Sequence, residues 1–438
     1  MTSFFSWMTS KEEKMSSTGT EKKSTMTTLI THIKYLINTR EENKLLRGKE
    51  LAELPTIEDA FLLIEDGLIA AYGAMYELEW KVPDLPKHII DSEGRSVMPC
   101  WCDSHTHIVF AGSRENEFVD KLKGLSYAEI AARGGGILNS SGKLNACSEE
   151  ELFQQSFKRL NEINKLGTGA IEIKSGYGLS VEGELKMLRV IKRLKKESGM
   201  MIKATFLGAH TYPQVYKENH QGYIDIIINE MLPVIAAEQL ADYIDVFCET
   251  GFFSPAEMET ICNAGAGYGL KPKLHINQLN SIGGIESAIK LNAVSIDHLE
   301  TMTEEDVQHL SHSSTIGTLL PTAAFFLRMP YQPARQLIDA GAAISLATDY
   351  NPGSSPSGNM NFAVALSCIQ MKMLPAEAIN AATINGAYAM EVQEQAGSIS
   401  VGKKANLIFL KSIPSLAYIP YSFATNLVDQ VMMNGVFI

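Results

Sequence analysis

The sequence has no uninterrupted apolar run of the roughly 18 residues that a membrane-spanning helix needs. Its six cysteines include no Cys-x-x-Cys pair, which disfavours a zinc ribbon or a thioredoxin-like motif. It has no cluster of lysine and arginine, and its formal net charge is −12. These absences argue against membrane insertion and against binding to nucleic acid or to anionic membrane surfaces. We therefore expect a cytoplasmic protein with reduced thiols.

What is present is typical of a globular enzyme. Hydrophobic residues make up 45% of the 438 residues, which is enough for a sizeable core. Residues 1–28 are instead rich in Ser, Thr, Lys and Glu and lack the apolar segment of a secretory signal. We expect this segment to be a disordered extension.

Short strands are predicted near both ends of the chain. Residues 29–37 alternate apolar and polar side chains, and residues 61–71 contain an Asp66-Gly67 turn, a strong hairpin signal. Residues 405–410 and 431–438 have the same character. We predict that residues 29–96 and 391–438 together form one small β-domain.

Between these ends, short apolar runs alternate with amphipathic segments such as residues 150–166 and 182–197. Strands that alternate with helices indicate a parallel sheet, and eight of them indicate a closed (β/α)₈ barrel, here over residues 97–390. The eight predicted strands are residues 97–101, 170–173, 204–209, 244–248, 273–276, 294–297, 316–320 and 343–347.

Polar residues stand at the ends of several of these strands, where such barrels carry their active sites. They are His105 and His107 after strand one, His210 after strand three, His275 on strand five, His298 after strand six and Asp349 after strand eight. The chain has only ten histidines, and random placement would rarely put them on four of eight strand ends. The pattern therefore favours a metal site.

The chemistry of these side chains agrees with that interpretation. His105 and His107 are two residues apart, so on a strand they point to the same face and can bind one ion. A lone His-x-His is a weak motif, and Asp349 alone would be read as a turn residue of the loop that follows it. Neutral imidazole suits zinc and iron. A metal ion with an open coordination position supports hydrolysis of amides, amidines or esters.

With these features the chain resembles the amidohydrolase superfamily, whose members carry a His-x-His on strand one, single histidines on strands five and six and an aspartate on strand eight. The resemblance implies a (β/α)₈ TIM barrel with a small β-sandwich built from both chain ends. It also implies one zinc or iron ion held by His105, His107, His275 and Asp349.

Within that superfamily the chain is most similar to the imidazolonepropionase family of histidine degradation. The segments that carry the resemblance are residues 109–115, 134–138, 172–179, 205–210, 245–249 and 347–355. Members of this family hydrolyse 4-imidazolone-5-propanoate to N-formimidoyl-L-glutamate, a ring opening that consumes water. The resemblance therefore implies a small anionic imidazolone as substrate.

The resemblance also assigns residues to the substrate, namely Arg114, Tyr127, Tyr177 and His210 as contacts and Asn351, Gly353 and Ser354 as pocket lining. Arg114 could grip the substrate propionate with two hydrogen bonds, although alone it would be read as a surface ion-pair residue. Without this context, Tyr177 would be read as an aromatic lid residue and His210 as a core histidine. His298 is expected to assist proton transfer or to polarise the carbonyl.

One segment departs from the family pattern. Where the family often has His-x-Asp-Glu, this chain has His275, Ile276, Asn277 and Gln278. Gln278 cannot act as a base at neutral pH, but its amide can orient a substrate. We therefore assign proton transfer to Asp349, assisted by His298. Lys174 falls on strand two, away from the usual place of a carbamylated lysine, so we predict one metal and a structural or loop-orienting role for Lys174.

Two other functions remain open at this stage. The chain could be an amidohydrolase for a different cyclic amide or an aminopyrimidine-like ring, or a barrel that binds metal without catalysis. Substrate profiling would distinguish an amidohydrolase for a different ring from the expected enzyme. Measurement of the metal content would test the non-catalytic alternative. We expect a homodimer, because this is the commonest oligomeric state.

Overall fold

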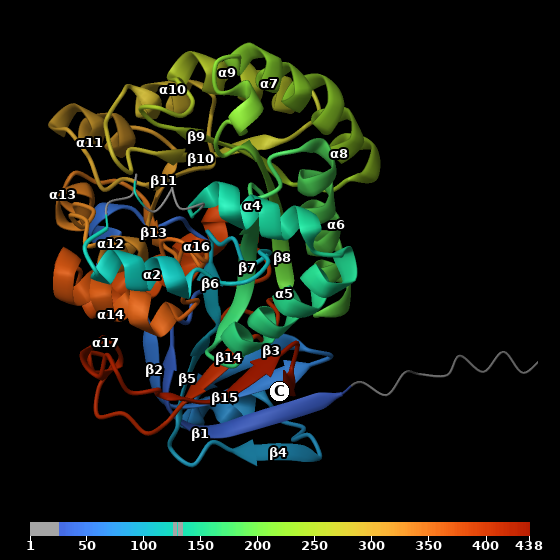
Figure 1. Cartoon of the computed structure of the whole chain (residues 1–438). Helices are drawn as coiled ribbons and strands as arrows, with labels where there is room; N and C mark the ends of the chain where they lie inside the picture. Colours follow the sequence, from blue (N-terminus) through green and yellow to red (C-terminus); the bar gives the residue numbers. More distant parts are fainter. Residues whose placement is uncertain (1–25, 126–128, 130–134) are drawn as a thin grey trace, which may run out of the picture.

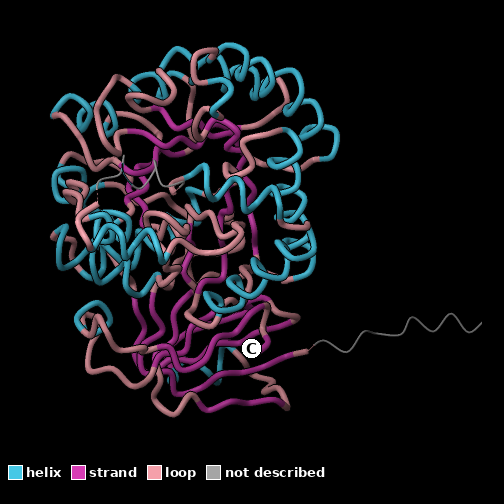
Figure 2. Tube along the Cα trace, in the orientation of Figure 1, coloured by secondary structure: helices cyan, strands magenta, loops and turns pink. Residues whose placement is uncertain are grey.

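The computed structural model describes residues 26–125, 129 and 135–438, so Tyr127 and most of the predicted N-terminal extension lie outside the described residues. The larger part of the molecule is a parallel sheet of eight strands surrounded by helices (Figures 1 and 2). In spatial order its strands are β6 (Trp101–Asp103), β7 (Thr168–Lys174), β8 (Met201–Ala209), β9 (Tyr243–Cys248), β10 (Lys271–Ile276), β11 (Ser295–His298), β12 (Ile316–Leu319) and β13 (Ile344–Leu346).

The sheet curls until its first and last strands meet just beyond their carboxyl ends. There, Thr106 and Tyr350 form a parallel bridge, and two backbone hydrogen bonds run from His107 to Tyr350 (2.9 Å) and from Asp349 to His105 (3.0 Å). The segments after β6 and β13 thereby close the barrel. The predicted (β/α)₈ fold is confirmed.

Helices on the outside cover this sheet (Figure 1). Their apolar faces pack on the strands, as in α6, where Leu188 and Ile191 are fully buried, while Ser180 caps the start of this helix by accepting from the backbone of Gly183. Among the described residues, the helices longer than five residues are α2 (Glu115–Leu122), α4 (Ile137–Ala146), α5 (Glu149–Asn164), α6 (Val181–Glu197), α7 (His220–Ile226), α8 (Leu232–Glu238), α9 (Pro255–Ala266), α10 (Gly284–Lys290), α11 (Glu304–Ser311), α12 (Pro321–Leu327), α13 (Ala334–Asp339), α14 (Met360–Met371), α15 (Pro375–Ala382) and α16 (Ile384–Ala389).

A second sheet contains strands from both ends of the chain, as predicted, and lies against one end of the barrel (Figure 1). Its hairpin turn at Gly67 packs against the turn at Gly435, where a Cβ on either glycine would collide with the opposite backbone. This close approach ties the two ends together. The strands are β1 (Thr27–Ile37), β2 (Thr56–Glu65), β3 (Leu68–Ala74), β4 (His88–Asp91), β5 (Ser96–Pro99), β14 (Leu407–Leu410), β15 (Val428–Met433) and β16 (Val436–Phe437).

One predicted strand, residues 97–101, is divided between the two sheets. Val97 and Pro99 belong to β5, which pairs with β14 in the terminal sheet, and only Trp101 belongs to the barrel strand β6. The chain changes sheets at Cys100, whose amide donates to Asn406, whereas the amide of Trp101 donates to Gly167 at the start of β7. The sequence does not reveal this switch between sheets, because the residues before and after Cys100 are all buried and form one continuous apolar run.

Within the described residues, no helix is long and apolar enough to cross a membrane. All six cysteines are free, and four of them are buried. Burial raises the pKa of the Cys102 thiol to about 12, so this thiol is protonated and unreactive at neutral pH.

Candidate active site

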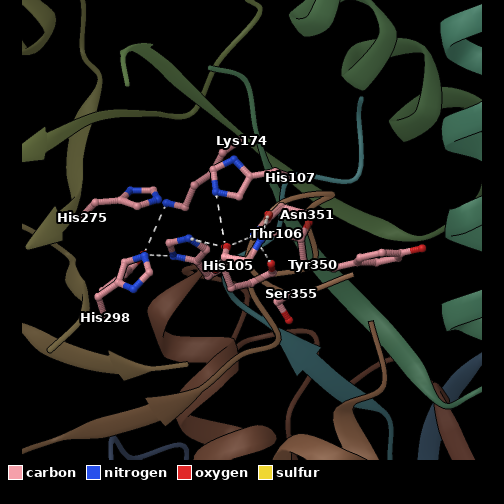
Figure 3. Close-up of polar contacts among 12 residues, drawn as sticks. His105, Thr106, His107, Lys174, His275, His298, Tyr350, Asn351 and Ser355 are labelled. Atoms are coloured by element: carbon pink, nitrogen blue, oxygen red, sulfur yellow. Dashed lines mark hydrogen bonds and ion pairs between the residues drawn. The ribbon is translucent and has the colours of Figure 1, made fainter. Parts of the chain in front are cut away.

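Three histidines meet at the carboxyl end of the barrel. His105 and His107 follow β6 and His275 lies on β10, and one ring nitrogen from each falls within 4.8 Å of the other two. Asp349 closes the group from the segment after β13, with Oδ1 3.5 Å from Nε2 of His105 and 3.6 Å from Nε2 of His107. The structure thus brings together the four residues predicted to bind metal. Figure 3 shows the rings of the three histidines and of His298 gathered in one place.

The outward nitrogens of two of these rings are held by buried carboxylates. Nδ1 of His105 lies 2.6 Å from Oδ2 of Asp297, and Nδ1 of His275 lies 2.7 Å from Oδ2 of Asp245. A carboxylate that accepts at Nδ1 leaves the lone pair of Nε2 free on the inner side, an arrangement that recurs around metal-bound histidines.

Burial lowers the pKa of His105 and of His275 well below the usual histidine value, so both rings are neutral, as metal ligands must be. Among the residues that the structure describes, the buried Nε2 of His105 has no hydrogen-bond partner. Buried polar atoms are nearly always satisfied, so this atom calls for a ligand. The residues present therefore fit a divalent cation.

The backbone is strained at two of the positions that turn side chains into the site. Asp349 has a φ of 53° and His298 a φ of 89°, both in the left-handed region that residues with a Cβ seldom adopt. Such conformations cost about 1–3 kcal/mol each and persist where the surrounding structure imposes them. Here they place a carboxylate and an imidazole beside the three histidines.

A cluster of buried charges surrounds Lys174, the last residue of β7. Its Nζ lies 2.8 Å from Glu172, 2.9 Å from Asp245 and 3.3 Å from Asp297. Burial alone would lower the pKa of Lys174, but the three carboxylates more than offset it and raise the pKa above its usual value. Lys174 is therefore a fixed positive charge in the barrel interior.

A small cavity of about 60 Å³ opens on the histidine group. It gathers most of the residues predicted to act in catalysis or to contact substrate, together with Phe247, which was not predicted. Its lining residues are His107, Tyr177, His210, Phe247, His275, Gln278, His298, Asp349, Asn351 and Ser354.

Three of these side chains have distinct environments. Tyr177 is almost fully buried, and burial raises the pKa of its phenol, which is therefore protonated. His210 stacks on His107 at 5.6 Å between ring centroids, and burial lowers its pKa to about 4, so its ring is neutral. Burial would lower the pKa of His298 as well, but Glu300, 3.3 Å from its Nδ1, raises it. His298 is thus more basic than the other rings.

The loop after Asp349 connects the site to Arg114. Asn351 Oδ1 accepts from the amides of Gly353 and Ser354, both at 2.8 Å, and Ser354 Oγ donates to Asp349 Oδ2 at 3.1 Å. Burial raises the pKa of Asp349 to about 6, while these polar neighbours act in the opposite direction. The Asn351 turn therefore fixes both the loop and the carboxylate.

Arg114 lies on the other side of this loop. Its Nε donates to Ser140 at 2.8 Å, and its Nη1 occupies the space that a side chain at position 353 would need. Its Nη2 is buried and has no hydrogen-bond partner within the described ranges. Arg114 also lines a larger cavity of about 540 Å³ that Phe118, Phe326 and Tyr350 border. An unsatisfied guanidinium nitrogen is suited to an anion.

The two amides that depart from the family pattern have separate environments. Gln278 lines the small cavity. Asn277, by contrast, is fully buried and donates to Asp306, the residue that completes the capping box of α11. Of these two amides, Gln278 therefore faces the cavity and Asn277 does not line it.

The carboxylates that orient the rings are not predicted by the sequence. The sequence places Asp245 in one of the segments that resemble the family and gives no role to Asp297. A signal for Asp245 existed, because an aspartate in the otherwise apolar strand β9 must have a buried partner. Its partner could not be named, because β10 is more than twenty residues away along the chain.

The amidohydrolase family matches residues 185–438. The imidazolonepropionase of Flavobacterium johnsoniae is 59% identical over 94% of this chain and 99% of its own length. The chain belongs to the imidazolonepropionase family of amidohydrolases. The imidazolonepropionase of Alkaliphilus metalliredigens is 41% identical over 93% of this chain and 96% of its own. Membership in this family makes the chain a metal-binding hydrolase of C–N bonds.

Solved structures of more distant amidohydrolases share the fold. A zinc-bound adenosine deaminase from Xanthomonas campestris superposes with a TM-score of 0.69 at 15% identity, covering 94% of this chain and 92% of its own. A triazine hydrolase variant has a TM-score of 0.70 at 16% identity and covers 94% of each chain. At such low identity the likeness extends to the architecture alone.

Gly353 offers a test of the Arg114 geometry in this imidazolonepropionase-family chain. Gly353→Ala places a methyl group where Nη1 lies, so the guanidinium must leave its preferred rotamer, at a cost of about 0.5–1.5 kcal/mol. We expect KM for an anionic substrate to rise about threefold to tenfold, with kcat nearly unchanged. The control is Gly142→Ala in α4, where an added Cβ meets nothing. Equal KM values in steady-state kinetics of both variants would refute this role of Gly353.

Proposed function

We propose that this chain hydrolyses 4-imidazolone-5-propanoate to N-formimidoyl-L-glutamate, a step of histidine degradation. The observation that carries the proposal is the pairing of a metal-binding cluster with Arg114 across one short loop, where the buried Nη2 of this arginine has no hydrogen-bond partner among the described residues. The cluster suits a ring carbonyl, and the Nη2 of Arg114, which is unpaired within the described part of the chain, suits a carboxylate. The family to which the chain belongs supplies the identity of the ring.

In this proposal one zinc or iron ion is held by His105, His107, His275 and Asp349. Three neutral imidazoles and one carboxylate suit either metal. When bound, the ion supplies Lewis acidity that activates water and polarises the ring carbonyl. The single-ion assignment is supported by Lys174, whose amine is occupied by three carboxylates and is not available as a bridging carbamate.

The chain's own groups manage the protons. Water adds its oxygen to the ring carbonyl carbon, the bond from that carbon to the ring nitrogen breaks, and the products are a carboxylate and the formimidoyl group. Asp349 takes the proton from the attacking water and gives it to the departing nitrogen. Its environment suits this task, because burial raises the pKa of the carboxyl to about 6.

His298 and Gln278 both line the cavity and assist in different ways. His298 is backed by Glu300, so it can donate a hydrogen bond to the carbonyl oxygen on which charge develops. The amide oxygen of Gln278 can accept from the N–H of an imidazolone, which orients the ring without taking a proton. Tyr177 and His210 line the same cavity and offer further hydrogen bonds to the substrate.

The substrate propionate binds Arg114 in this proposal, beside Gly353 and Ser354. Tyr177 lines the small cavity together with Asp349, and the charge of Arg114 lowers the pKa of its phenol while that of Asp349 raises it. A propionate anchored at Arg114 would hold the ring over the histidine cluster. This arrangement fixes which ring carbon faces the attacking water.

Metal stoichiometry tests the single-ion proposal. We expect one equivalent of zinc or iron per chain, measured by elemental analysis after gel filtration, and loss of activity when a chelator removes it. Activity should return on addition of either metal. Two tightly held equivalents per chain would contradict the single site and would require a ligand other than the four named.

A substrate panel tests the function. The purified, metal-loaded protein should act on 4-imidazolone-5-propanoate with a kcat/KM at least about 100-fold above that for an imidazolone without the propionate, because the charged anchor is then lost. Aminopyrimidine rings, as used by deaminases of this fold, should not react. Faster turnover of any other cyclic amide or amine would favour the alternative, an amidohydrolase for a different ring.

A further inference from the structure

The buried cation Lys174 contacts the carboxylates that orient two of the proposed metal ligands. Its Nζ lies 2.9 Å from Oδ2 of Asp245 and 3.3 Å from Oδ2 of Asp297. These are the same oxygens that accept from Nδ1 of His275, at 2.7 Å, and from Nδ1 of His105, at 2.6 Å. One lysine therefore bridges two carboxylate–histidine pairs that come from different strands.

The other oxygens of both carboxylates are also occupied. Oδ1 of Asp245 accepts the backbone amide of His275 at 3.0 Å, and Oδ1 of Asp297 accepts Ser295 Oγ at 2.6 Å. Lys174 is thus the group that fixes the direction of the remaining oxygens. Its third partner is Glu172, two residues earlier on β7 and on the same face of the strand.

We propose that Lys174 is a positioning residue for the metal site: by bridging Asp245 and Asp297 it locks the rings of His275 and His105 with Nε2 facing the ion. The inference rests on the proposed metal ligands and not on the identity of the substrate. It adds to them the physical link between His105, which follows β6, and His275 on β10. Partners of this kind are worth roughly 10–100-fold in metal affinity or activity.

The sign of the effect separates this role from simple electrostatics. Lys174 carries a positive charge close to the place of a divalent cation, so removing that charge should tighten metal binding if Coulomb repulsion were its main effect. A positioning role predicts the opposite, because the carboxylates and the rings they hold would lose their fixed orientation. Coulomb repulsion therefore predicts tighter metal binding when the charge of Lys174 is removed, and a positioning role predicts weaker metal binding.

The test is Lys174→Met, which keeps the length and apolar stem of the side chain and removes the ammonium group. The backbone role of this residue is preserved, because its amide still donates to the Thr106 carbonyl between His105 and His107. Zinc affinity is measured on metal-free protein by competition with a chelating dye. We expect the dissociation constant to rise about 10–100-fold. An unchanged or lower dissociation constant would overturn the proposal.

The chain provides a matched control in Lys273→Met. Lys273 is equally buried and also pairs with Glu172, at 3.0 Å, but its remaining partners are Ser295 and the Ala389 carbonyl. Within the described part of the chain, Lys273 makes no ion pair with Asp297: its hydrogen bond goes to Ser295, which donates to the Asp297 oxygen that does not hold His105. Against the effect of burial, however, the charge of Lys273 also lowers the pKa of Asp297. We expect this variant to lose thermal stability while its zinc affinity stays within about threefold of wild type. An equal loss of affinity in both variants would mean a general effect of buried charge and would refute the specific role.

Two further measurements keep the proposal testable if Lys174→Met folds poorly. Lys174→Gln keeps an N–H donor without the charge, and we expect it to lose about tenfold in zinc affinity, less than the methionine variant. In cobalt-loaded protein the visible absorption bands report ligand geometry, so they should shift in either Lys174 variant and remain unchanged in Lys273→Met. Cobalt bands identical to wild type in Lys174→Gln would contradict the proposal. These readouts need no substrate, so they are independent of any failure of the proposed reaction.

Discussion

Asp349→Asn should lower kcat by about 10³-fold while the protein still binds its metal. Asparagine has the same shape, and its amide oxygen can still face the ion and accept from Ser354 Oγ, as Asp349 Oδ2 does at 3.1 Å. It cannot take up a proton at neutral pH, so it cannot relay the proton from water to the departing ring nitrogen. Steady-state kinetics on variant protein with its metal content measured would provide the check.

The control for this prediction is Asp103→Asn. Asp103 is a second buried carboxylate near the barrel mouth, but both its oxygens accept from Thr348, at 3.0 and 2.6 Å. Its replacement should lower stability and leave kcat within about tenfold of wild type, below the usual contribution of a proton-transfer group. If metal-loaded Asp349→Asn kept near-normal turnover, proton transfer would have to be assigned to another group, with His298 the first choice.

Arg114→Met should lower kcat/KM by about 100-fold, mainly through KM. Removing one partner of a buried charge pair costs about 2–5 kcal/mol, and a factor of 100 corresponds to about 2.7 kcal/mol. The physical reason is that Nη2 is buried and lacks a protein partner among the described residues, and in the proposed function this nitrogen binds the substrate carboxylate. Initial rates over a range of substrate concentrations separate KM from kcat.

The matched control is Lys143→Met. Lys143 is an exposed cation that donates to the Ser113 carbonyl, next to Arg114 in the chain. Its loss removes the same charge from the same neighbourhood without touching the proposed carboxylate site, so KM should change less than about twofold at moderate salt. If the two variants raised KM equally, a general electrostatic attraction would explain substrate binding and no specific grip by Arg114 would be needed.

Much of the architecture could be predicted because strand and helix periods differ. Residues 150–166 have helical periodicity and form α5 (Glu149–Asn164), and the Asp66-Gly67 signal marks the hairpin between β2 and β3. The first barrel strand was predicted to begin at Val97, but it begins at Trp101. The apolar run from Val97 to Trp101 contributes to both sheets and is buried in each. A change of sheet leaves no trace in hydrophobicity when both sides are buried.

The site shows the same limit. His105, His107 and Asp349 could be selected because histidines are few in the chain and gather at the predicted strand ends, where barrels carry their active sites. The contacts of Asp245 and Lys174 could not, because both lie inside apolar strands and their partners are brought in by the curl of the barrel. A sequence reveals that a polar residue lies in an otherwise apolar strand. The partner that compensates for its burial depends on the register between strands that are far apart in the chain.

The most direct test of the account follows the absorbance of 4-imidazolone-5-propanoate with time. Metal-loaded protein should remove the absorbance and produce N-formimidoyl-L-glutamate in equal amount, detected by mass spectrometry. Protein treated with a chelator should not change the rate of spontaneous decay until zinc or iron is restored. Persistence of the absorbance with fully metal-loaded, folded protein would contradict the proposed function.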